Sequence, residues 1–159
     1  MSAPTTAVLA MTPQNLLDHW QGHRRLTRRV IEAFPDDQLF TFSVGGMRPF
    51  GVLAMEIITM SGPMVRGMVT DQWAVQGDRN PRPKAELLTL WDETTKEIES
   101  LWPQIRPEKF QEKFTAFGQY EDLGVSLISY VVDNEIHHRG QGYVYLRALG
   151  IAPPAFWER

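Results

Sequence analysis

The segment Asp133-Asn134-Glu135-Ile136-His137-His138-Arg139-Gly140-Gln141 places two amides, two carboxylates and two imidazoles in a stretch that otherwise has the pattern of an apolar helix. On a helix of 3.6 residues per turn, Asn134 and His138 lie one above the other. The same stripe continues through apolar residues between Leu127 and Tyr145, which predicts that it is buried. An unpaired buried polar group costs about 1–3 kcal/mol, so we expect a metal ion or a carboxylate as the partner.

Four segments of the chain have helical periodicity and distinct boundary signals. Thr12 and Pro13 have the residue types of an N-cap and a first helical position. The second segment is apolar on nearly every side, which predicts a helix in the middle of the protein, kinked or shortened at Gly62-Pro63. The four helices are expected at residues 13–34, 49–67, 83–101 and 122–149.

Residues 102–121 form a long connection that is rich in aromatic residues and suits either a short strand or an aromatic flap. Four helices of this length, one of them wholly apolar, predict an all-α fold. We expect a single domain over residues 1–159: a four-helix bundle with a long crossover loop before the last helix.

The composition excludes several classes of protein. The chain has 159 residues, enough for one domain, and a net charge of −3, which makes nucleic acid a poor partner. It has no cysteine, so disulfides, thiolate ligands and thiol nucleophiles are excluded. Residues 1–11 lack the basic start of a signal peptide, and no run of about 18 apolar residues occurs. We expect a cytoplasmic protein with no membrane or nucleic-acid partner.

Glu56 is the one acidic residue in the apolar interior of the second predicted helix. A carboxylate buried there without a cation would be protonated, whereas a metal or an imidazolium would keep it ionised. Together with Asn134 and His138 on the last helix, Glu56 predicts an inward-facing cluster of the kind that builds metal sites in bundles. The alternative is a hydrogen-bonded polar network without an ion.

Other polar residues are candidates for supporting roles. His137 and Glu135 lie to either side of the buried stripe, which predicts places at the surface or behind the ligands, with either residue a candidate base or proton shuttle. His19 and His23 have chelating i, i+4 spacing but lie at the edge of an apolar stripe, as boundary histidines do. The basic residues of the same helix are expected to form a solvated face offset by acidic neighbours: Arg24, Arg25, Arg28 and Arg29.

Three stretches of the sequence resemble the DinB/YfiT-like superfamily, and the resemblance spans nearly the whole chain. They are Leu16-Leu17-Asp18-His19-Trp20, Gly46-Met47-Arg48-Pro49-Phe50-Gly51, and Glu135-Ile136-His137-His138-Arg139-Gly140-Gln141 with the following Leu146-Arg147-Ala148-Leu149-Gly150. The resemblance implies an up-down-down-up bundle whose site is three histidines that hold a divalent metal. Those positions fall at Glu56, Asn134 and His138 here, so one of the three histidines remains.

What the resemblance implies for function depends on these replacements. Characterised relatives look like thiol-dependent transferases or isomerases, which implies a metal-dependent enzyme of the thiol transferase or hydrolase type. One imidazole, one carboxylate and one amide make a poor zinc site, so we expect zinc, nickel or manganese to be bound weakly or not at all. The alternative is a non-catalytic member that keeps the pocket for a small ligand or serves as an interaction protein. The family also implies a homodimer, for which Phe156 and Trp157 would supply apolar contact.

Overall fold

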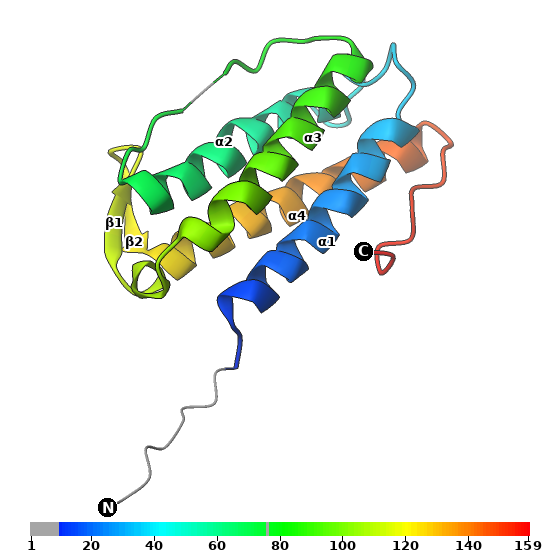
Figure 1. The fold of residues 1–159 in the computed structure, drawn as a ribbon. Helices are drawn as coiled ribbons and strands as arrows, with labels where there is room; N and C mark the ends of the chain where they lie inside the picture. The colour runs from blue at the N-terminus through cyan, green and yellow to red at the C-terminus, as the bar shows by residue number, and fades with distance from the viewer. Residues whose placement is uncertain (1–9, 76) are drawn as a thin grey trace, which may run out of the picture.

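The structure is a computed structural model that describes residues 10–75 and 77–159. The sequence predicts no signal peptide in residues 1–11, and residues 1–9 of this segment lie outside the described residues. Four long helices form a bundle with a small hairpin at one end (Figure 1). The helices are α1 (Pro13–Ala33), α2 (Phe50–Thr70), α3 (Lys84–Leu101) and α4 (Gly124–Ala148). Each boundary lies within three residues of the predicted one, and Thr12 caps α1 through a capping box with Asn15.

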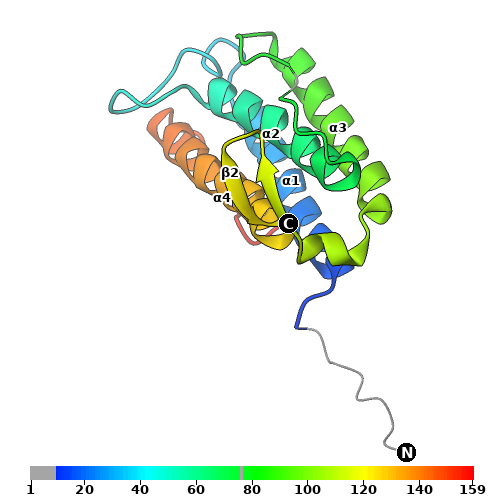
Figure 2. The same ribbon diagram turned by 90° about the vertical axis from the view of Figure 1, so that its left-hand side faces the viewer.

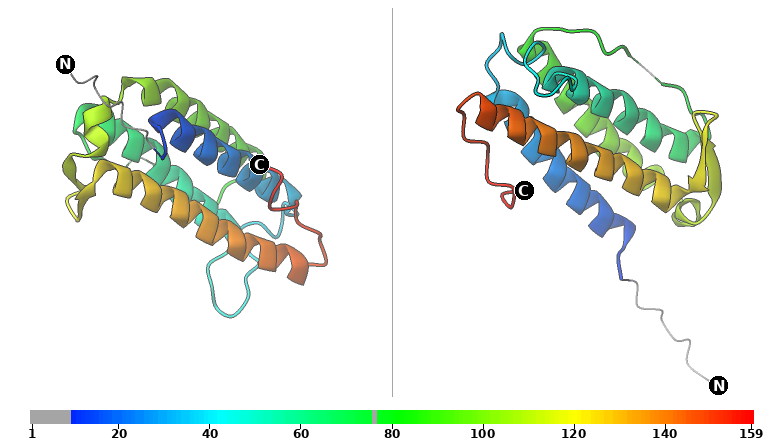
Figure 3. Two further views of the ribbon diagram at one scale, coloured as in Figure 1. Left: turned by 90° about the horizontal axis from the view of Figure 1, so that it is seen from below. Right: turned by 180° about the vertical axis from the view of Figure 1, so that it is seen from behind.

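The helices run up, down, down and up, as the resemblance implies (Figures 1 and 3). Helices α1 and α4 run in one direction, and α2 and α3 run in the other. Each of α1 and α2 packs against both α3 and α4, so that α1 and α2 lie on one diagonal of the bundle. A helix that packs against two neighbours buries a wide arc of its surface. Because α4 packs against both α1 and α2, polar residues on two of its faces are interior.

The connection before α4 is long, as predicted, but it stays at one end of the bundle (Figure 2). It contains two short 3-10 helices, Trp102–Gln104 and Pro107–Phe110, and the antiparallel hairpin β1 (Lys113–Ala116) and β2 (Tyr120–Leu123). The segment that crosses the length of the bundle is the loop between α2 and α3 (Figure 1). The crossover therefore lies between α2 and α3, and the prediction that it precedes the last helix is wrong. The predicted short strand is one half of a hairpin.

Helix α2 is the central element and continues through Pro63 to Thr70. The predicted early end is wrong, because burial of the last two turns among apolar neighbours compensates for the hydrogen bond that proline cannot donate. By length and composition α2 is apolar enough to span a membrane, but 72% of its most apolar window is buried inside the bundle. Its composition is therefore explained by its place in the core.

Close packing of α2 against α4 brings the two helices of the predicted cluster together. A Cβ atom on Gly142 would lie 2.6 Å from the ring of Phe50, so glycine is required for this approach. One turn further on, the hydroxyl of Tyr145 donates a hydrogen bond of 3.0 Å to the carbonyl of Arg48, just before α2. The two contacts fix the start of α2 against the second half of α4.

Candidate functional site

Glu56, Asn134 and His138 converge between α2 and α4. Nε2 of His138 lies 3.1 Å from Oε1 of Glu56, and Nδ2 of Asn134 lies 3.2 Å from the same nitrogen. The Asn134 amide also donates to Oε1 of Glu56 over 3.5 Å. The side chains of His138 and Glu56 are only 7% and 12% exposed. The three positions at which the resemblance implies histidines thus form one largely buried polar cluster.

Two arginines from outside the predicted cluster bind the other oxygen of Glu56. Arg48, just before α2, donates to Oε2, and Nη1 of Arg79, in the crossover loop, lies 3.1 Å from the same atom. Both guanidinium groups are about half exposed. The cation that a carboxylate at this position requires is therefore present in the chain itself.

These partners determine the ionisation of Glu56. Burial opposes its ionisation, but hydrogen bonds from Arg48 and His138 outweigh burial and lower the pKa of Glu56 below its usual value. The carboxylate is therefore ionised near neutral pH. On the side of the imidazole that faces away from Glu56, Nδ1 of His138 lies 3.0 Å from Oε1 of Gln141. This contact orients the imidazole toward Glu56.

The fit of a divalent metal to this cluster depends on which atoms point inward. Oε1 of Glu56 and Nε2 of His138 are legitimate ligands at a suitable separation. Asn134 turns its amide nitrogen, which is no ligand, toward them, and its buried Oδ1 has no hydrogen-bond partner. The two guanidinium groups would repel a second cation nearby. As oriented, the cluster supplies two ligands, and no three His, Asp or Glu side chains within residues 10–75 and 77–159 are grouped to hold a metal.

Glu135 is fully buried on a different face of α4, which corrects the expectation of a surface or supporting position. Its carboxylate accepts hydrogen bonds from Thr27 Oγ1 at 2.6 Å and Trp20 Nε1 at 3.2 Å, both on α1. Because α4 has neighbours on two sides, this second face is also interior. The structure does not bring Glu135 to Glu56, so a role as base or proton shuttle in the cluster has no geometric support.

Arg24 is the ion-pair partner of Glu135 and is also fully buried, so its predicted place on a solvated face is wrong. Its Nη1 lies 3.8 Å from Oε2 of Glu135, and its guanidinium stacks 4.1 Å from the ring of Trp91 on α3. Burial disfavours the charged form of both groups. It therefore lowers the pKa of Arg24 to about 10 and raises the pKa of Glu135. Arg28 and Arg29 behave as predicted, since Arg28 pairs with Glu32 and Asp92 and Arg29 pairs with Glu158. Arg25 is exposed.

The other candidate histidines occupy unlike environments. His137 is exposed, as predicted, with its ring 5.1 Å from that of His138. His19 is exposed, whereas His23 is buried and its Nδ1 accepts a hydrogen bond of 2.9 Å from Arg139. Burial, with Arg139 the next cause, lowers the pKa of His23 from 6.5 to about 4. His23 is therefore a neutral interior residue and not a boundary histidine.

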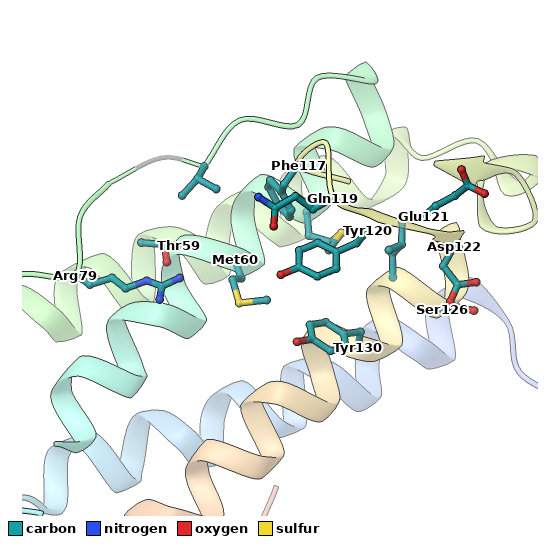
Figure 4. Close-up of a pocket in the computed structure, with 13 residues that line it drawn as sticks. Thr59, Met60, Arg79, Phe117, Gln119, Tyr120, Glu121, Asp122, Ser126 and Tyr130 are labelled. Carbon is teal, nitrogen blue, oxygen red and sulfur yellow. The ribbon is translucent and has the colours of Figure 1, made fainter. Parts of the chain in front are cut away.

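A cavity of about 460 Å³ adjoins the polar cluster between α2, α4, the hairpin and the crossover loop. Figure 4 shows Thr59 and Arg79 toward one end, Tyr120 and Tyr130 in the middle, and Asp122 toward the other end. Arg79 belongs to both the cavity wall and the Glu56 cluster. Much of the remaining wall is apolar, with Met60, Met64, Val75, Phe117 and Leu127 among its residues.

Fold and cluster together define the class: an up-down-down-up helical bundle with an inward-facing polar cluster between α2 and α4. A sequence profile of the DinB family matches residues 1–159, so the chain belongs to the DinB family. No curated protein matches it.

Solved structures with the same fold include two bacterial DinB-like proteins. The one from Bacillus subtilis has 21% identity and a TM-score of 0.73, and the one from Bacillus cereus has 16% identity and a TM-score of 0.74. Each match covers 91% of this chain and 97% of the other. A variant of the mycothiol-dependent maleylpyruvate isomerase is also similar, with 10% identity and a TM-score of 0.64, over 83% of this chain and 61% of the isomerase. At these identities the likeness establishes the fold.

Proposed function

We propose that this DinB-family protein binds a small organic ligand in the cavity beside α2 and α4, and that the Glu56 cluster forms its polar end without a resident metal. One observation carries the proposal: Glu56, at the first of the three family metal positions, is neutralised by Arg48 and Arg79. A metal would have to displace these guanidinium groups or bind beside them, at an electrostatic cost. The cavity volume lies within the range of about 300–1,000 Å³ that is usual for small-molecule sites.

Three measurements test this proposal. Elemental analysis of protein purified without chelators should give far less than one zinc, nickel or manganese per chain, and a chelator should leave the melting temperature unchanged. Ligand-observed NMR with a library of small organic probes should give hits that Ser126→Phe, a substitution in the cavity wall, abolishes. Val144→Phe, at an exposed position of α4, is the matched control and should keep them. Stoichiometric metal, or hits that ignore Ser126→Phe, would contradict the proposal.

The second candidate is a metal-dependent enzyme, and one observation favours it. The buried Oδ1 of Asn134 has no hydrogen-bond partner, and a rotation of the amide by 180° would turn it toward Glu56 and His138 as a third ligand. The hydrogen bond that Nδ1 of His138 donates to Oε1 of Gln141 is of the kind that orients metal-bound imidazoles. A bound ion would supply Lewis-acid activation of a substrate thiol or water. Stoichiometric metal lost on Asn134→Ala would favour this candidate.

A homodimer and a cytoplasmic location remain predictions. Phe156 and Trp157 are 66% and 69% exposed, which leaves both side chains accessible for a contact between two copies. If they form the dimer interface, the double substitution Phe156→Ser with Trp157→Ser should shift the mass in light scattering from dimer to monomer. A monomeric wild type would contradict the prediction directly.

A further inference from the structure

The cavity beside the Glu56 cluster has an aromatic middle and two ends of opposite charge. Tyr120 on β2 and Tyr130 on α4 have ring centroids 6.3 Å apart and planes only 25° from parallel. They are 53% and 52% exposed, so about half of each side chain is accessible to a ligand. Figure 4 shows the two rings side by side along the cavity, with both hydroxyls pointing toward the Thr59 side. Two nearly parallel, accessible rings provide a stacking surface for a planar ligand.

Among the described residues of the cavity wall, Arg79 is the one cationic side chain. It shares the single negative charge of Glu56 with Arg48, so this end of the cavity has a surplus of positive charge. A half-exposed guanidinium with a spare fork of donors binds a carboxylate through two parallel hydrogen bonds.

The opposite end of the cavity repels an anion. Asp122 and Glu121 lie there, on β2. Asp122 accepts a hydrogen bond of 2.7 Å from the amide of Leu123, and Glu121 lies 3.8 Å from Nζ of Lys113, so these contacts position both acidic side chains at this end. An anionic ligand group is therefore directed to the Arg79 end alone.

From this arrangement we infer that the ligand is an aromatic acid, whose ring stacks on Tyr120 and Tyr130 and whose carboxylate binds Arg79. The inference rests on the proposed ligand-binding function and specifies its ligand class. Arg79 remains close enough to Glu56 to exchange one carboxylate for the other, while Arg48 continues to neutralise Glu56.

The test uses three matched probes in isothermal titration calorimetry: 2-naphthoate, neutral 2-naphthamide and saturated decahydro-2-naphthoate. Wild type should bind 2-naphthoate about tenfold more tightly than either analogue, because each analogue lacks one of the two recognised features. Arg79→Gln should remove the preference for the acid over the amide. Arg25→Gln removes an exposed guanidinium of α1, far from the cavity wall, and should keep that preference.

Tyr130 supplies the second arm of the test. Tyr130→Leu should bring 2-naphthoate to the affinity of its saturated analogue, and Tyr130→Phe should restore the difference because the ring is retained. Equal affinities for acid and amide in wild type would overturn the aromatic-acid inference while leaving a ligand-binding cavity in place. If none of the three probes binds but the NMR hits still depend on Ser126, the aromatic-acid inference is overturned and the proposed ligand-binding function is not. Failure of both experiments would overturn the proposed function as well.

Discussion

Oε2 of Glu56 on α2 lies 3.1 Å from Nη1 of Arg79. Arg79 lies in the crossover loop, which begins at the end of α2 and runs back along the bundle. The pair joins the buried polar cluster to the wall of the cavity. A position at which the resemblance implies a metal ligand is therefore an ion-pair acceptor here. What surrounds Glu56 decides its chemistry, and each surrounding interaction has a measurable consequence.

Glu56→Gln should lower the free energy of unfolding by about 1 kcal/mol at pH 7, because both guanidinium groups are half exposed and can return to water. The pKa of Glu56 is lowered in the folded protein, so its contribution is complete above its unfolded value near 4.5 and is lost as the pH falls through the folded pKa. Urea unfolding at pH 7 and pH 3 should show a smaller difference between wild type and variant at the lower pH. Glu99→Gln, at an exposed position of α3, is the control. A difference as large at pH 3 as at pH 7 would contradict the ion-pair explanation.

The double substitution Glu56→His with Asn134→His should restore metal binding, because the three positions already converge within 3.1–3.5 Å. Nickel and zinc affinity should rise by at least about 2 kcal/mol over wild type in titration calorimetry. Glu56→His alone should give a smaller gain, since it adds only one imidazole. Equal and negligible binding by all three proteins would show that convergence of the side chains is not sufficient.

Arg24→Met should destabilise the protein by about 3–5 kcal/mol at pH 8, because it leaves the fully buried Glu135 without its ion-pair partner. The pKa of Glu135 is already raised by burial, and removal of Arg24 raises it further. For an acid with a raised folded pKa, stability is lost as the pH rises from the unfolded value through the folded one, so the penalty should be smaller at pH 5 than at pH 8. Urea unfolding at both pH values measures it. Arg25→Met, at the exposed neighbouring position, should change stability by less than about 0.5 kcal/mol.

His23 should make the folded protein less stable as the pH falls from 6.5 to about 4. Its pKa is lowered to about 4 in the fold, so the unfolded chain binds the additional proton over this window. His23→Gln should reduce the slope of unfolding free energy against pH between pH 4 and 6.5, which urea unfolding across this range measures. If wild type and His23→Gln have parallel profiles, His23 is not the neutral buried group described above.

The sequence alone determined the helices, their number and the convergence of Glu56, Asn134 and His138. Helical boundaries follow from local signals such as Thr12 and Pro13, and the apolar stripes follow from the 3.6-residue repeat. A helix that is apolar all round has to be central, and a lone Glu56 within it has to face another polar group. These conclusions need only the covalent neighbours of each residue and the cost of burial.

Only the tertiary structure decided which cations pair with Glu56 and which faces of α4 are interior. Arg48 and Arg79 are 8 and 23 residues from Glu56 and lie outside the helices, so no periodicity relates them to it. Arg24 and Glu135 lie beside polar neighbours in the sequence, yet both are buried because α1 and α4 each pack against more than one helix. A single helical stripe describes contact with one neighbour. The width of the buried arc depends on how many helices surround it, which only the assembled bundle determines.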